Sequence, residues 1–361
     1  MSPFNLVLAP VVILVGALLA ATPYIMPPTE CFTVTVPPSA KSDPRIRAIY
    51  RRYTIAVVAA TLVCAAICLL ISSHGAAIAA VSILPIVLGF AAMLYARAQV
   101  RAIKEQEGWA ASQRRSAAII ADDSAPRPIS LAWNLLFLVL VAVLAVACIA
   151  LYDRFPDRIP MQVGFDGTVT RYADKTGGTV LFPAIITAFM GAIFAISHWM
   201  ICRSKKPIDP AAPASSALAY GSFARAQSII LLAGGLILCA TMGITFILSS
   251  MKTISMQAAA IIVSVAGVGF VIAELWLSIA RGQSGARLAT ELRDSDEIVQ
   301  DDDARWILGS FYFNPDDPSF TVPKRFGVGW TINFASRTAL LIIAGLILVT
   351  IVFAVVVENL L

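Results

Sequence analysis

Residues 131–151 read LAWNLLFLVLVAVLAVACIAL, a stretch without a single charged side chain. An α-helix needs about 20 apolar residues to cross the hydrocarbon layer of a membrane. Backbone groups in lipid must form their hydrogen bonds within the segment, so a stretch of this kind predicts a helix. Eight stretches reach this length, and we expect an all-α polytopic membrane protein with spans at residues 4–26, 53–72, 76–97, 131–151, 180–202, 223–250, 254–279 and 338–358.

The composition of the whole chain agrees with a lipid environment. Of the 361 residues, 58% are hydrophobic and only 14% are charged, compared with about 25% in a typical soluble domain. This balance argues against a soluble enzyme, a disordered chain and a disulfide scaffold. The six cysteines are scattered without a CxxC pair, which is typical of free thiols. The start of the chain, Met1–Asn5, has no Lys or Arg, so we interpret the first stretch as a retained span and not a signal peptide.

The basic residues predict the orientation of the spans. Of the 27 Lys and Arg residues, 22 fall in the connections after the first, third, fifth and seventh spans, and five in the other connections. Because cytoplasmic loops of membrane proteins are enriched in Lys and Arg, the basic connections should face the cytoplasm. We therefore expect a protein of the cell membrane with both termini outside.

The predicted spans and connections divide the chain into five parts. They are an N-terminal four-helix half (1–151), an extracellular hairpin loop (152–180), helices five to seven (180–280), a cytoplasmic segment (281–337) and a last span (338–361).

Three connections carry local signals. Residues 31–36 alternate like a short strand, and Asp43 before Pro44 is typical of a helix start. In the fourth connection, residues 161–165 and 168–172 flank Asp166-Gly167, a strong hairpin signal. The cytoplasmic segment is rich in aromatic and turn residues between positions 306 and 334, so we expect short strands that pack on the helix ends.

Two of these connections resemble known sequence families. The fourth connection resembles the signature of the bacterial SdpI-like toxin-immunity membrane family, through residues 156–162, Gly167, Tyr172 and Lys175. The cytoplasmic segment resembles a short domain of unknown function found in larger relatives. The motif residues we take from these resemblances are Ile159, Pro160, Gln162, Asp166, Gly167 and Lys175 in the outer loop, and Trp306, Asn314, Asp316, Asp317, Lys324, Arg325, Trp330 and Asn333 in the cytoplasmic segment.

The resemblance implies a function in resistance to membrane-active peptides. In that family, resistance is sometimes coupled to capture of a transcriptional repressor, so a peptide and a cytoplasmic transcriptional regulator are the implied partners beside the lipid bilayer. One position departs from the family pattern, because Gln162 stands where the family has a histidine. An amide neither titrates near neutral pH nor binds metals as an imidazole does, which puts a metal or proton role for this loop in question.

A separate group of polar residues lies within the predicted spans. Glu274 interrupts the seventh span, and an ionisable residue in a span is a functional candidate. His198, Asn134 and Gln227 lie near the predicted inner ends of the fifth, fourth and sixth spans. If these helices are neighbours, the four side chains form an inner vestibule with a His198–Glu274 pair as its core. Alternatively, Glu274 reaches the interface and His198 is an interfacial ring beside Trp199.

Three classes of function remain open. The first is a non-enzymatic immunity or signalling protein. The second is a secondary transporter that couples proton movement to Glu274, and the third is a membrane-embedded enzyme. The chain contains no GxxxxGKS/T, HExxH, GxSxG or GxGxxG motif, which argues against an ATP-driven pump and against familiar membrane proteases. We predict no catalytic residues, cofactor, metal site or nucleic-acid partner.

Overall fold

The structure is a computed structural model, and it describes residues 3–27, 29–70, 75–111, 126–163, 168–206, 213–287, 298, 301–327 and 329–360. The chain forms two compact units. Unit 1 comprises residues 1–126, 204–223 and 278–339, and unit 2 comprises residues 127–203, 224–277 and 340–361. The domain boundaries expected from the sequence stay a prediction.

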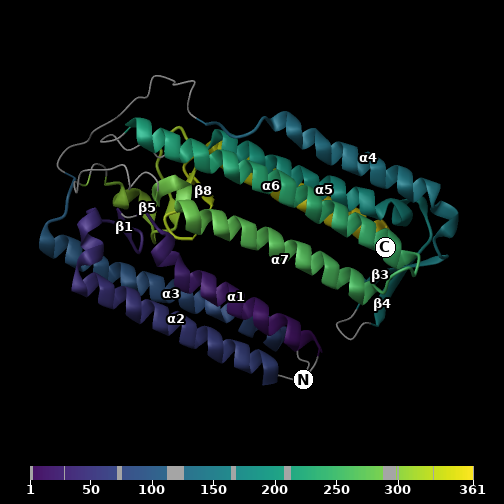
Figure 1. The fold of residues 1–361 in the computed structure, drawn as a ribbon, viewed down its shortest axis with the longest axis horizontal. Helices are drawn as coiled ribbons and strands as arrows, with labels where there is room; N and C mark the ends of the chain where they lie inside the picture. The colour runs from purple at the N-terminus through teal and green to yellow at the C-terminus, as the bar shows by residue number, and fades with distance from the viewer. Residues whose placement is uncertain are drawn as a thin grey trace. The chain divides into compact units, whose positions relative to one another are not determined.

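Long helices dominate both units (Figure 1). Seven of those described are long and apolar enough to cross a membrane, which confirms an integral, multi-pass membrane protein. The helix α1 has an apolar part, Ala9–Ile25, that is shorter than the others, so the eighth span stays a prediction. The helices are α1 (Pro3–Ile25), α2 (Pro44–Leu70), α3 (Gly75–Glu107), α4 (Leu135–Ala150), α5 (Gly177–Arg203), α6 (Pro213–Ser250), α7 (Met256–Arg281) and α9 (Arg337–Leu360).

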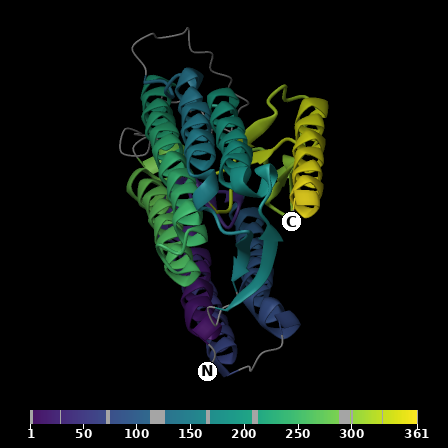
Figure 2. The same ribbon diagram turned by 90° about the vertical axis from the view of Figure 1, so that its right-hand side faces the viewer.

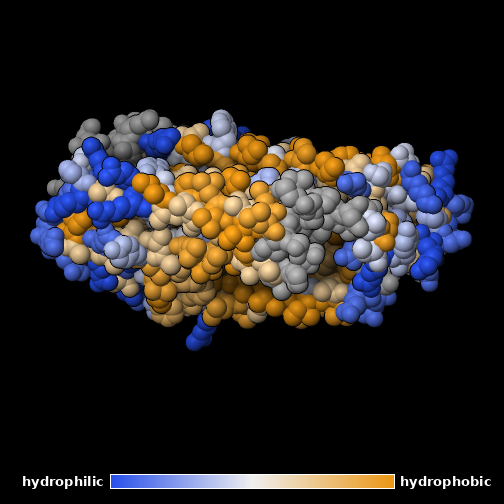
Figure 3. Space-filling model, turned by 90° about the horizontal axis from the view of Figure 1, so that it is seen from below, coloured by the Kyte–Doolittle hydropathy of each residue, from blue (hydrophilic) through white to orange (hydrophobic). Residues whose placement is uncertain are grey.

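The surface agrees with this assignment. On the face that Figure 3 shows, hydrophobic residues cover the middle stretches of the helices, and hydrophilic residues gather at both ends. Many large apolar side chains of the spans are exposed, for example Val146 at 66% and Leu341 at 73%. Lipid is the environment in which such exposure carries no hydrophobic penalty.

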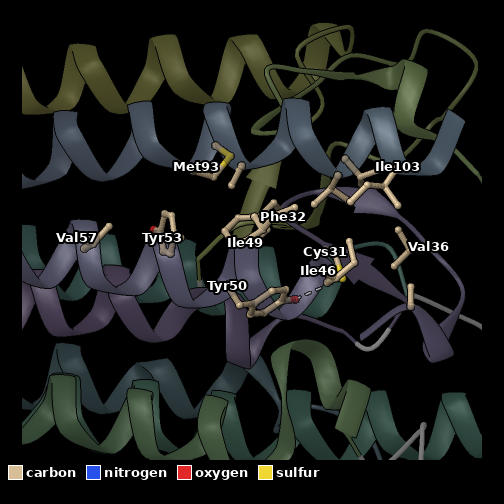
Figure 4. Close-up of a cluster of buried hydrophobic side chains, with 14 of the residues drawn as sticks. Cys31, Phe32, Val36, Ile46, Ile49, Tyr50, Tyr53, Val57, Met93 and Ile103 are labelled. Carbon is tan, nitrogen blue, oxygen red and sulfur yellow. Dashed lines mark hydrogen bonds between the residues drawn. The ribbon is translucent and has the colours of Figure 1, made fainter. Parts of the chain in front are cut away.

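In unit 1, the helices α1, α2 and α3 lie side by side and cover a hairpin of β1 (Glu30–Cys31) and β2 (Val34–Thr35). The sequence predicted one short strand over residues 31–36, whereas the chain turns back at Phe32 and Thr33, which both have positive φ values of 45° and 65°. The turn buries Phe32 completely between Tyr50 and Tyr53 of α2 (Figure 4). The alternating apolar residues thus belong to a buried turn and not to one extended strand.

In unit 2, aromatic rings hold the helices together. Phe194 of α5 stacks on Phe137 of α4 and meets Phe270 of α7 edge to face. On α6, Gly234 and Gly235 leave the space that Phe270 and Phe194 occupy. Small residues at these positions therefore allow close helix packing.

Among the residues that the structure describes, four antiparallel strand pairs complete the fold, which confirms that the mostly helical chain has small strand pairs. In unit 2, β3 (Arg158–Val163) pairs with β4 (Val169–Asp174), and Figure 2 shows these teal arrows. In unit 1, in addition to β1 with β2, β5 (Trp306–Ile307) pairs with β6 (Phe311–Tyr312), and β7 (Thr321–Pro323) pairs with β8 (Trp330–Ile332).

Candidate functional site

The four polar residues predicted for the inner vestibule all lie in unit 2, and the structure joins them in two pairs. The side-chain amide of Asn134 lies 3.0 Å from Nδ1 of His198, while Nε2 of His198 lies 3.1 Å from the carbonyl oxygen of Ile129. The second pair joins α6 to α7, because Nε2 of Gln227 donates to the carboxylate of Glu274.

The hydrogen bonds of His198 define one form of its ring. The Ile129 carbonyl only accepts, so Nε2 carries the hydrogen, and the Asn134 amide donates to Nδ1. The same amide nitrogen also donates to the Leu131 carbonyl at 3.0 Å, which fixes its orientation. A neutral ring satisfies both neighbours. Both ring nitrogens of His198 therefore have a hydrogen-bond partner, and the direct pair of His198 with Glu274 stays a prediction.

Ser228 links the two pairs. Its hydroxyl accepts a hydrogen bond from the backbone amide of Ile129 at 3.1 Å, and it is the residue that follows Gln227 in α6. The segment before α4 is therefore bound through Ile129 to His198 of α5 and to Ser228 of α6. We call Ile129, Asn134, His198, Gln227, Ser228 and Glu274 the polar cluster of unit 2.

The polar cluster brings together groups that are costly to bury in a span. His198 is 1% and Gln227 8% exposed, and Oε1 of Gln227 has no hydrogen-bond partner among the described residues. An amide that donates to a carboxylate stabilises its ionised form, whereas a protonated carboxyl would satisfy an acceptor such as Oε1. The arrangement is therefore chemically able to hold either state of Glu274.

The hairpin of β3 and β4 is the second motif of interest. Ile159 is fully buried and belongs to the same apolar cluster as Leu144 and Cys148 of α4 and Val180 of α5. Pro160 is also buried, whereas Gln162 is exposed. Asp166 and Gly167, the predicted turn, lie outside the described residues.

Lys175 ties the end of β4 to the segment between α4 and β3. Its ammonium group donates to the Phe155 carbonyl at 3.1 Å and lies 4.6 Å from the centre of the Tyr152 ring. Its backbone amide donates to the Asp157 carbonyl at 2.8 Å. Lys175 thus closes the base of the hairpin.

Unit 1 contains a buried group of charges centred on Arg325, which is only 5% exposed. Its guanidinium group forms ion pairs with Asp302 and Asp303, and its Nε lies 3.5 Å from Glu30. It also donates to the Thr33 carbonyl at 2.9 Å. We call Glu30, Lys104, Asp301, Asp302, Asp303 and Arg325 the charge cluster of unit 1.

Asp303 is the most connected carboxylate in the charge cluster. It accepts from the backbone amide of Thr35 at 3.0 Å, from the Thr35 hydroxyl at 2.8 Å and from Lys104 at 2.7 Å. Burial opposes its ionisation, but Arg325 and Lys104 outweigh that effect and lower the pKa of Asp303 to about 2. The charge on Asp303 therefore ties the segment before α9 to β2 and α3.

Glu30 is in the opposite situation. Burial raises its pKa from 4.5 to about 7, against the opposing attraction of Arg325, while Asp302 and Asp303 add repulsion. Its Oε2 atom has no hydrogen-bond partner among the residues the structure describes. Because burial raises the pKa of Glu30 while cations lower that of Asp303, Glu30 keeps its proton to a higher pH than Asp303 does.

Asn333 organises the motif around residues 314–319. It is fully buried, and its side-chain amide donates to the carbonyls of Asn314, Asp317 and Ser319 at 2.8, 3.1 and 3.2 Å. Its side-chain oxygen accepts from the amide of Asn314 at 3.0 Å. The Asn333 side chain thus forms the hydrogen bonds to the loop backbone that a neighbouring strand would otherwise form.

The remaining motif residues have distinct positions. Asp317 pairs with Lys205 at 2.6 Å and accepts from the Tyr312 hydroxyl at 2.9 Å, while Asp316 pairs with Arg305 at the surface. Burial opposes the ionisation of Asp317, but Lys205 and neighbouring amides lower its pKa. Trp306 is buried, and the guanidinium carbon of Arg325 lies 5.3 Å from the centre of its ring. Lys324 is exposed. The ring of Trp330 in β8 contacts that of Phe223.

The sequence singled out Arg325 but not the acids and the lysine around it. Residues 301–303 stood out only as an acidic stretch, and Glu30 and Lys104 carried no motif. A run of three aspartates in a chain with few charges was the available signal, since such residues need cations when they are buried.

Comparisons with known proteins match two segments of the chain. Residues 138–187, which include most of α4 and all of β3 and β4, match a domain of unknown function (DUF1648), and residues 315–340 match a family of unknown function (DUF5808). Neither a curated protein nor a solved structure matches the chain. The hairpin of β3 and β4 therefore lies within one recognised domain whose function is not known, and the motif at residues 306–334 overlaps another.

Proposed function

We propose that the chain is a non-enzymatic immunity or signalling protein of the SdpI-like type, which acts against membrane-active peptides. The observation that carries this proposal is the attachment of the outer hairpin to the spans. Because Ile159 and Phe155 are buried among α4, α5 and α6 residues, a ligand that binds the hairpin acts directly on the helix ends.

The exposed side of the hairpin suits a peptide ligand. Tyr172 is 46% exposed, and the guanidinium carbon of Arg158 lies 5.6 Å from the centre of its ring. The strands form a two-stranded sheet, and β4 contains no proline, so its outer edge has the amides that pair with an added strand. An extended peptide would gain backbone hydrogen bonds there and an aromatic contact with Tyr172.

In this proposal the hairpin faces the outside and the charge cluster of unit 1 faces the cytoplasm, as the basic residues predict. The cytoplasmic segment then reports peptide binding, and a transcriptional regulator is a candidate partner for it. The lipid bilayer remains the constant partner of the spans.

The test is survival under challenge with membrane-active peptides. A deletion strain should be more sensitive than the parent, and the chain with Tyr172→Ala should restore resistance poorly. Tyr95→Ala is the matched control, because Tyr95 is also an exposed aromatic residue but lies in α3, outside the strands. Equal survival of the deletion strain and its parent would contradict the proposal.

A second candidate function is proton-coupled transport, and the Gln227–Glu274 hydrogen bond in the spans favours it. The test is flux in proteoliposomes under a pH gradient. Transport that follows the gradient and disappears in Glu274→Gln would support this candidate, whereas a gradient-independent result would remove it.

A further inference from the structure

The hairpin of β5 and β6 in unit 1 has two unlike faces. Trp306 pairs with Tyr312, and both are buried. Ile307 pairs with Phe311, and these side chains are 55% and 44% exposed. Alternation along a strand places them on the face opposite Trp306 and Tyr312. The exposed face is therefore apolar.

The tip of this hairpin continues the apolar face at an unusual backbone position. The amide of Ser310 donates to the Ile307 carbonyl at 3.2 Å, and the two central residues of this turn, Leu308 and Gly309, have φ values of 50° and 68°. Asn and Gly are the residues that such turns favour, and leucine is disfavoured. Leu308 is nonetheless present there, and it is 52% exposed. A strained leucine exposed to water would have neither a conformational nor a solvation benefit.

Contacts within unit 1 place the hairpin tip at the end of an apolar span. A side chain at Gly309 would collide with Thr33 and would lie 2.9 Å from the guanidinium group of Arg97. Arg97 is the first charged residue after the apolar part of α3. The tip therefore lies where the hydrocarbon layer ends and the headgroups begin.

Contacts of β6, the other strand of the hairpin, independently place it at the same depth relative to the membrane. Phe311 meets Phe334 edge to face, with 5.6 Å between the ring centres. Phe334 lies three residues before Arg337, at which the span α9 begins. Two different spans thus locate the apolar face at a membrane boundary.

We infer that Ile307, Leu308, Phe311 and Phe313 form a wedge that inserts into the boundary between lipid headgroups and acyl chains. Phe313 belongs to it because it is 45% exposed and follows Phe311 by two positions. Apolar and aromatic side chains are stable at this depth, roughly 5–10 Å into the interface. Basic residues suit the headgroups above it, and Arg101, which follows Arg97 by one helical turn, is 69% exposed in its side chain.

The wedge assigns a mechanical role to the charge cluster. Arg325 and Asp303 fix the segment that contains β5 to β2, and the wedge fixes the tip of the same segment to the lipid. A change in lipid packing at this boundary would then act on the hairpin directly. This inference does not depend on the peptide ligand of the outer hairpin.

The experiment measures the depth of single fluorophores in the full chain, reconstituted as one copy per nanodisc. Cys202 is replaced by serine, since it is exposed and the other five cysteines are buried. An environment-sensitive probe is then attached at Leu308→Cys. Ile307→Cys is a second wedge position in case the first variant does not fold. Asp316→Cys is the matched control in the same segment, because the Asp316 side chain is 77% exposed.

We expect a blue-shifted emission at positions 308 and 307, and quenching by lipids that carry a spin label near the headgroup. The probe at position 316 should show neither effect. Unquenched emission at both wedge positions would overturn the inference, because the tip would then lie in water. A blue shift without lipid quenching would overturn it as well, since protein and not lipid would cover the tip. Equal quenching at 308 and 316 would also contradict a wedge.

Discussion

Gln227 of α6 donates a hydrogen bond to the carboxylate of Glu274 in α7. Both residues lie in helices that are long and apolar enough to cross a membrane. A carboxylate in such a helix is costly without a donor, so this contact lowers the cost of placing Glu274 in its span.

The first prediction concerns the stability of that contact. We expect Gln227→Ala to lower the free energy of unfolding by about 1–3 kcal/mol, because it leaves a buried carboxylate without its amide donor. Thermal unfolding of the purified protein in detergent measures the loss. Gln257→Ala, an exposed glutamine at the start of α7, should change stability by less than about 0.5 kcal/mol. An equal loss of unfolding free energy in the two variants would show that the hydrogen bond does not stabilise the fold.

The second prediction concerns pH and Glu30. Its pKa is about 7 in the folded protein and 4.5 in the unfolded chain. Between these values the folded protein holds a proton that the unfolded chain has released, so stability falls as the pH rises from 4.5 to 7. A difference of this size corresponds to at most ~3 kcal/mol.

We expect Glu30→Gln to remove this part of the pH dependence. The variant should unfold at a temperature that changes less between pH 5 and pH 8 than that of the parent chain. The comparison is made over the same buffers, so the other titrating groups, which both proteins share, cancel. The same slope in both proteins would mean that Glu30 does not hold its proton.

The third prediction tests the charge cluster through Asp303. We expect Asp303→Asn to destabilise the protein by about 3 kcal/mol at pH 7, because it leaves Arg325 and Lys104 short of a buried partner. Asp316→Asn is the control, since its ion pair with Arg305 is exposed and such pairs contribute about 0–1 kcal/mol.

The pH dependence of Asp303 has the opposite sign to that of Glu30. Its pKa is lowered from 3.8 to about 2, so its stabilising contribution is complete above pH 3.8 and is lost as the pH falls through 2. In Asp303→Asn the acid limb of the stability profile should therefore be shallower. If the stability of Asp303→Asn fell as steeply at acid pH as that of the parent chain, the contacts that lower the pKa of Asp303 would not stabilise the fold.

The helices could be predicted from the sequence because lipid imposes a simple length rule. The prediction 180–202 became Gly177–Arg203, and 254–279 became Met256–Arg281. The start of α6 was predicted ten residues too late, since Pro213–Ser222 is a polar helical extension that a hydropathy rule does not see. The hairpin of β3 and β4 was also predictable, because alternating residues flanked a turn signal.

The pairing of polar residues could not be predicted in the same way. Depth in the membrane follows from position in a span, but the neighbours of a helix depend on packing. Asn134 and His198 were expected at a similar depth, and only the structure joins them. The partners of Arg325 come from Glu30 and residues 302–303, far apart in the chain, and no local pattern indicates such contacts.

The last prediction concerns Gly309. It has a φ of 68°, and a Cβ atom there would collide with Thr33 and crowd Arg97. Gly327 has a φ of 88° but no atom near its missing side chain, so it is a matched control for backbone strain alone. We expect Gly327→Ala to cost about 1–2 kcal/mol, the penalty for an L-residue in the left-handed region. Gly309→Ala should cost more, because the turn must also move away from Thr33. Equal losses in thermal unfolding would show that the hairpin tip does not approach α3 as closely as the structure places it.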